Sequence, residues 1–124
     1  MVTRAIRGAT TVEEDREELV LQATEALIIE MVEQNDVEID DIASVIVSTT
    51  TDVTSVFPAR AIRSIEGWAY VPVMCTHEMD VPGAIQKCIR LMMHVNTNKT
   101  QREMEHIYQN EAVRLRPDLV KEDK

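Results

Sequence analysis

One stretch of this 124-residue chain has the spacing of a long amphipathic helix. Between residues 19 and 31 apolar side chains recur every three or four positions, which places them on one helical face. These side chains are Leu19, Val20, Ala23, Leu27, Ile28 and Met31. Much of the remaining chain alternates in polarity with the period of β-strands. A chain with one long helix and several strands buries that helix against a sheet, so we expect an α+β domain.

Both ends of this helix carry sequence signals. Residues 11–14 (Thr-Val-Glu-Glu) have the pattern of a capping box, in which Thr11 accepts from the first turn and Glu14 reaches back. The acidic residues that follow suit the positive end of the helix dipole. We expect the helix to end near residues 34–36, with Asn35 in the left-handed conformation that often terminates helices.

The other elements are predicted to be short. Strands are expected at residues 2–9, 43–48, 68–75, 84–96 and 106–109, and Pro72 implies that its strand is at a sheet edge or pairs irregularly. Short helices are expected at 57–63 and within 98–105, followed by an extended stretch at 115–118. Together these elements predict a single mixed β-sheet with one long helix and short helices. So few helices leave one sheet face without a cover.

The formal net charge of −9 is unevenly distributed. Residues 13–41 hold twelve acidic residues and one base, a net charge of −11, whereas the remainder has a net charge of +2. The acidic balance argues against nucleic acid and anionic membranes as partners. Nine of the thirteen bases are Arg, the residue suited to bidentate recognition of carboxylates. These arginines either form a small-anion site or replace Lys on the surface.

The length fits a single domain over residues 1–124, with a flexible tail from about residue 119. The first residues contain no apolar segment of a secretory signal, and no stretch is long and apolar enough to span a bilayer. Cys75 and Cys88 lack the spacing of a metal site, and a reduced, cytoplasmic setting fits them best.

A dense polar segment, residues 75–80 (Cys-Thr-His-Glu-Met-Asp), follows a predicted strand. A metal site is disfavoured because no His-x-x-x-His or Cys-x-x-Cys spacing is present. A nucleophilic Cys75 with a His base would need an orienting third group, and His77 is too near Cys75 in the sequence to favour this chemistry. A polar site, in which Glu78 accepts a substrate hydroxyl, and a simple solvated turn both remain open.

Arginines form the second candidate group. Arg7 and Arg90 lie in the middle of predicted strands, where Arg is rarely buried without an acidic partner. Either internal carboxylates or an external anion neutralise them. The chain has three glycines and no phosphate-binding loop, which favours a carboxylate ligand over a nucleotide.

Several motifs, taken in order, resemble the monofunctional, trimeric chorismate mutases of the pseudo-α/β-barrel type. They extend from about residue 4 to residue 119, without gaps. The motifs are Arg7-Gly8-Ala9-Thr10-Thr11-Val12, Phe57-Pro58-Ala59, Gly67-Trp68, Tyr70-Val71-Pro72-Val73, Cys75, Glu78-Met79-Asp80-Val81, Lys87-Cys88-Ile89-Arg90, Met92-Met93, Tyr108 and Leu115-Arg116-Pro117-Asp118-Leu119.

The resemblance implies a homotrimer with active sites between adjacent subunits and a reaction without cofactor or metal. The implied reaction is the Claisen rearrangement of chorismate, a dicarboxylate, to prephenate, in the shikimate route to phenylalanine and tyrosine. Arg90 would stabilise the ether oxygen, Arg7 would bind a carboxylate, and Glu78 would accept from the ring hydroxyl.

The resemblance also implies a wider set of substrate-binding residues. Tyr108 would donate to a carboxylate, and Cys75 would lie beside Glu78. The walls and flanking positions would be Phe57, Ala59, Arg60, Arg63, Val73, Met74, Leu115 and Arg116. Residues 57–63 would come from one subunit and most of the others from its neighbour. The alternative is a trimeric small-anion-binding or regulatory module on the same fold, without mutase activity.

Overall fold

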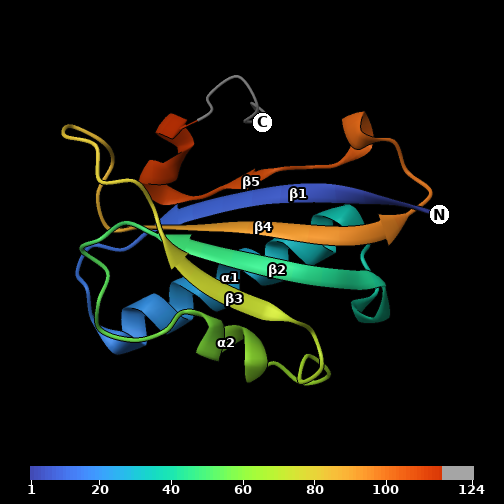
Figure 1. The fold of residues 1–124 in the computed structure, drawn as a ribbon, viewed down its shortest axis with the longest axis horizontal. Helices are drawn as coiled ribbons and strands as arrows, with labels where there is room; N and C mark the ends of the chain where they lie inside the picture. Colours follow the sequence, from blue (N-terminus) through green and yellow to red (C-terminus); the bar gives the residue numbers. More distant parts are fainter. Residues whose placement is uncertain (116–124) are drawn as a thin grey trace.

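The computed structural model describes residues 1–115 (Figure 1). Two α-helices, three short 3₁₀ helices and five strands follow one another along this part of the chain. They are β1 (Val2–Thr11), α1 (Glu17–Asn35), η1 (Ile39–Asp41), β2 (Ile42–Thr49), α2 (Ala59–Arg63), β3 (Val73–His77), β4 (Cys88–Thr97), η2 (Gln101–Glu103), β5 (Ile107–Tyr108) and η3 (Asn110–Leu115). No helix in residues 1–115 is long and apolar enough to cross a membrane.

All five strands form one sheet, in the order β3-β2-β4-β1-β5 (Figure 1). The central strand β4 runs antiparallel to both β1 and β2, whereas β3 is parallel to β2 and β5 is parallel to β1. This arrangement confirms the predicted mixed sheet with one long helix. Strand β3 lies at the sheet edge, where the backbone nitrogen of the preceding Pro72 has no ladder bond to donate.

The prediction for the start of the long helix is wrong. Helix α1 begins at Glu17, and its N-cap residue Arg16 makes no side-chain capping bond. Thr11 is instead the last residue of β1, opposite Cys88, and its hydroxyl accepts from the Glu111 amide at 3.2 Å. Pairing with β4 over ten residues therefore extends β1 to Thr11, the first residue of the capping-box pattern.

The end of α1 was predicted to within one residue. A Schellman motif closes the helix, with the amide of Val37 bonded to the carbonyl of Val32 at 3.1 Å. Its left-handed residue is Asp36, with a φ of 51°, and not Asn35 as predicted. Asn35 is the last helical residue, and its buried side chain bonds to a distant segment.

Two predicted strands start later in the structure. Residues 68–72 form turns, from which Trp68 inserts its ring into the core, so that β3 begins only at Val73. Residues 84–87 also lie outside β4, because Lys87 adopts a left-handed φ of 51° and donates its amide to Asp52. The stretch predicted as extended begins with Leu115, which ends η3, and its other residues lie outside the described part.

The face of the sheet against α1 holds the apolar core. Gly8 of β1 lies so close to α1 that a Cβ atom there would come within 2.4 Å of the Met31 sulfur. Glycine at this position therefore permits the close approach of helix and strand. Ile6, Met93 and Val47 are fully buried on the same face, together with Ile28 of α1.

The opposite face carries the predicted arginines. Arg7 lies opposite Met92 in the β1–β4 ladder, and Ala9 lies opposite Arg90. Residues that face each other across a ladder project to the same side, as do residues two apart in one strand. Arg7 and Arg90 therefore share one face, away from Gly8, and neither α1 nor α2 covers that face (Figure 1).

Candidate active site

Arg90 and Glu78 form an ion pair beside the exposed face of the sheet. The Arg90 Nη1 atom lies 3.3 Å from Glu78 Oε1, with 42% of the Arg90 side chain and 28% of the Glu78 side chain exposed. Glu78 follows β3, and its amide donates to the Thr49 carbonyl at 2.8 Å, which extends the pairing of β3 with β2. The polar segment at 75–80 thus supplies a carboxylate to one of the strand arginines.

Arg7 and Tyr108 come together through the short pairing of β1 with β5. Ala9 lies opposite Tyr108, and the Gln109 amide donates to the Ala9 carbonyl at 2.9 Å. Beyond the two paired residues, the Arg7 amide donates to Nδ1 of His106 at 2.9 Å. Arg7 and Tyr108 are both half-buried, so both can present polar atoms to a ligand at this face.

A second group of predicted residues lies elsewhere in the chain. Phe57, Arg60 and Cys75 line a hollow of about 620 Å³ between the loop before α2 and the end of β3. Phe57 is 72% exposed, and Arg60 pairs with Glu17 of α1 at 2.9 Å. Neither Arg7 nor Arg90 lines this hollow, and Cys75 therefore belongs with Phe57 and Arg60 within one chain.

The remaining predicted residues differ in how accessible they are. Ala59 is buried at the start of α2, Val73 and Leu115 are half-buried, and Arg63 is exposed. Met74 is 68% exposed on the edge strand. Arg116 and the tail predicted from residue 119 lie outside the described residues.

Two carboxylates that the sequence reading missed hold the loops around these groups. Asp15 accepts from the amides of Thr54 and Ser55, at 2.9 and 3.2 Å, just before Phe57. Burial raises the pKa of Asp15, but these hydrogen bonds outweigh it and leave the pKa below its ordinary value. Asp52 accepts from the Lys87 amide at 3.0 Å, at the entrance to β4.

The cysteines and histidines offer no metal site in the described chain. Within residues 1–115, no three His, Cys, Asp or Glu side chains are grouped closely enough to hold a metal ion. Both Cys75 and Cys88 are free thiols, and burial raises the pKa of Cys88 to about 11. Cys88 is therefore protonated near neutral pH and is a poor nucleophile.

Residues 3–119 match the sequence profile of the family "Chorismate mutase type I". The chain belongs to this family. Chorismate mutase AroH of Bacillus subtilis (strain 168) is 49% identical over 119 residues, which cover 96% of this chain and 94% of that protein. Chorismate mutase AroH of Thermus thermophilus is 45% identical, with 95% and 97% covered.

A solved structure agrees with these relatives. The chorismate mutase from Clostridium thermocellum is 47% identical and superposes with a TM-score of 0.84, covering 87% of this chain and 96% of that one. The chain is thus an enzyme, a chorismate mutase of aromatic amino acid biosynthesis. The alternative of a binding or regulatory module without mutase activity has no support from these relatives.

Proposed function

We propose that the chain converts chorismate to prephenate at the exposed sheet face, by electrostatic preorganisation around Arg90. The observation that supports this most strongly is the grouping of Arg7, Arg90 and Glu78 on one side of the sheet. Two cations and one carboxylate acceptor match a dianionic substrate that carries a ring hydroxyl.

The reaction needs little more than this. It is intramolecular, so no nucleophile and no proton transfer is required. The enzyme must hold the ether chain in a compact, reactive conformer, and it must place a cation where negative charge develops on the ether oxygen. A guanidinium that already lies beside a carboxylate is held in one orientation before substrate arrives.

Each predicted side chain then has a stated role. Arg90 stabilises the ether oxygen and holds a carboxylate, Arg7 binds a carboxylate, and Tyr108 donates a hydrogen bond to a carboxylate. Glu78 accepts from the ring hydroxyl, and Cys75 contributes from the hollow that it lines with Phe57. The walls and the outer charges are Phe57, Ala59, Arg60, Arg63, Val73, Met74, Leu115 and Arg116.

We propose further that this site is completed in a homotrimer. Within one chain, the hollow lined by Phe57 and Arg60 contains neither Arg7 nor Arg90. An exposed Phe57 and an exposed Met74 supply apolar surface that a neighbouring subunit would bury. Two free cysteines fit the reducing cytoplasm, where we place the enzyme.

The direct test is consumption of chorismate by the purified protein, with no added metal or nucleotide. We expect prephenate to form at the rate at which chorismate disappears, and EDTA to leave that rate unchanged. Release of any other product in place of prephenate would contradict the proposed reaction.

Assembly is tested separately, by measuring activity per chain together with molecular mass over a dilution series. We expect specific activity to fall as the trimer dissociates, because the Phe57 group and the Arg90 group separate. A monomer with full activity would refute a site between subunits while leaving the reaction itself intact.

A further inference from the structure

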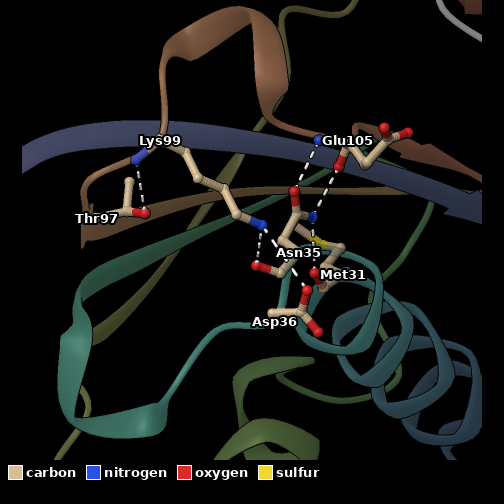
Figure 2. A network of polar contacts seen from close by, with 6 residues as sticks. All are labelled: Met31, Asn35, Asp36, Thr97, Lys99 and Glu105. Atoms are coloured by element: carbon tan, nitrogen blue, oxygen red, sulfur yellow. Dashed lines mark hydrogen bonds and ion pairs between the residues drawn. The ribbon is translucent and has the colours of Figure 1, made fainter.

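A buried, extensively hydrogen-bonded polar side chain lies at the end of α1. Asn35 is only 2% exposed, and its amide makes three hydrogen bonds (Figure 2). Its nitrogen donates to the carbonyls of Met31 and Glu105, at 2.8 and 2.9 Å, and its oxygen accepts from the Glu105 amide at 2.7 Å. The side chain of Asn35 thus pairs with the backbone of Glu105 as a neighbouring strand would (Figure 2).

The segment held in this way leads directly into β5. Glu105 lies three residues before Tyr108. Tyr108 belongs to β5, a strand in which only two residues are paired. A pairing of two residues contributes little stability by itself. Contacts outside the β1–β5 ladder must therefore fix the position of β5. One such contact is the bond from the Arg7 amide to His106, and another is the bond from the Gln109 side chain to Glu30 of α1, at 2.5 Å.

Closing the helix does not require these bonds from Asn35. The Schellman motif already satisfies the carbonyls of Val32 and Glu33, and Lys99 Nζ donates to the Asn35 carbonyl at 3.0 Å (Figure 2). Two of the three bonds of the Asn35 amide reach instead across 70 residues to Glu105. Asparagine is suited to this task because its amide donates and accepts at once.

We infer that Asn35 is a positioning residue for the mutase reaction, which places the Tyr108 hydroxyl relative to Arg7 by fixing the backbone of Glu105. Asn35 lies on the helix-covered side of the sheet and acts through β5 without touching substrate. This inference rests on the role of Tyr108 under the proposed function. Displacement of a positioned group by about 1 Å can cost about 100-fold in rate.

A double-mutant cycle tests the inference. We expect Asn35→Ala to lower kcat/KM about tenfold, because β5 loses its anchor. We expect Tyr108→Phe to lower kcat/KM as well, and Asn35→Ala to have almost no added effect in the Tyr108→Phe background. That dependence on Tyr108 is a readout that a merely structural residue would not give.

Lys99→Met is the matched control. It removes the bond to the Asn35 carbonyl at the same helix end but leaves the Glu105 backbone bonds in place. We expect it to lower the unfolding midpoint without changing kcat/KM. Equal losses of kcat/KM in Lys99→Met and Asn35→Ala would overturn the inference, since the helix end alone would then explain both.

The possible failures are distinguishable. If Tyr108→Phe lowers kcat/KM and Asn35→Ala lowers it by an independent, multiplicative factor, the positioning role is wrong while the proposed site stands. If Tyr108→Phe has no effect on kcat/KM, the role of Tyr108 in the proposed site is wrong and the inference falls with it.

Two further measurements cover the case in which Asn35→Ala does not fold. Asn35→Asp keeps an acceptor for the Glu105 amide but loses both donated bonds, and we expect the same dependence on Tyr108. In the unmodified enzyme, we expect the amides of Glu105 and Gln109 to exchange hydrogen with equal protection, because the inference requires the segment from Glu105 to Gln109 to open as one unit. Fast exchange at Glu105 beside slow exchange at Gln109 would overturn the inference.

Discussion

The face of the sheet that α1 covers and the face that carries Arg7 and Arg90 are built from alternate residues of the same strands. On the covered face, Ile6 and Met93 are fully buried within a single chain. On the other face, Arg7 and Arg90 remain partly exposed, and the Phe57 group lies in a separate hollow. One chain therefore completes its core but not its proposed active site.

This division separates the residues that stabilise the fold from those that we propose act on the substrate. Apolar burial stabilises the covered face whatever lies on the other side. The opposite face keeps cations that a well-packed core would not tolerate without partners. Substitutions on the two faces should accordingly change different measured quantities, and the predictions below test this in order of expected effect.

The largest effect is expected from Arg90 on the exposed face. Arg90→Ala should lower kcat by about 100- to 1000-fold, the typical effect of removing one preorganised donor to a developing charge. Arg90→Lys should be nearly as severe, because a Lys ammonium cannot reproduce the two-pronged geometry of a guanidinium. Single-turnover kinetics with chorismate measure both variants.

The unfolding of the Arg90 variants supplies the control for the comparison. A half-exposed ion pair contributes about 1 kcal/mol or less, so the free energy of unfolding should change little. Turnover of Arg90→Lys close to that of the unmodified enzyme would exclude the proposed role of Arg90.

A substitution on the covered face should have the opposite result, a loss of stability without a loss of activity. Ile28 of α1 is fully buried, and Ile28→Ala should lower the free energy of unfolding by about 2–5 kcal/mol through lost burial and a residual cavity. The folded fraction should keep its kcat/KM, because Ile28 lies on the covered face and Arg7 and Arg90 lie on the opposite one. Urea unfolding at fixed protein concentration measures the first quantity and initial rates measure the second. A loss of kcat/KM comparable to that of Arg90→Ala would show that the faces are not separable.

The sequence predicted the covered face of the sheet better than the face that carries the proposed site. The apolar stripe of α1 and the alternation in β1 and β4 predicted the covered face, because burial imposes a period on the sequence. The predictions failed where a local signal was overruled, as at Thr11, which ends β1 instead of capping a helix.

The proposed site was reached in a different way. Strand position and the polar segment singled out Arg7, Arg90 and Glu78, but the roles in the site came from a family resemblance. The long-range hydrogen bonds of Asp15, Asn35 and Asp52 were not predicted. Each of these three bonds to backbone amides between 35 and 70 residues away. Polar side chains with distant backbone partners leave no periodic signal, so only the folded chain reveals them.

Gly8 is a position where the two faces are expected to depend on each other, because it packs on α1 and directly follows Arg7. The Cβ atom of Gly8→Ala would lie 2.4 Å from the Met31 sulfur, so the Met31 side chain, the helix or the strand must shift. Overpacking of this kind costs about 1–3 kcal/mol of stability. Arg7 directly precedes Gly8 in β1. A shift of β1 should therefore displace Arg7 and raise KM for chorismate. Loss of stability with an unchanged KM would show that Arg7 is insulated from the core.

The smallest effect is expected from Asp15, which links the start of α1 to the loop before Phe57. Its hydrogen bonds from Thr54 and Ser55 lower its pKa, despite the opposing effect of burial. A depressed pKa means that the stabilisation is present above the unfolded-state pKa of about 3.9 and disappears as the pH falls through the folded-state pKa. Solvent screening keeps the contribution below about 1 kcal/mol.

Asp15→Asn removes this titration, so the difference in unfolding free energy between Asp15→Asn and the unmodified enzyme should shrink as the pH falls from 7 to 3. Urea unfolding at each pH, at fixed protein concentration, measures that difference. If the unfolding free energies of the two proteins changed with pH in parallel, the bonding of Asp15 to Thr54 and Ser55 would be contradicted. A small rise in the KM of Asp15→Asn for chorismate at pH 7 would show that the loop held by Asp15 positions Phe57 in the site. The loops beside the sheet would then affect both stability and substrate binding.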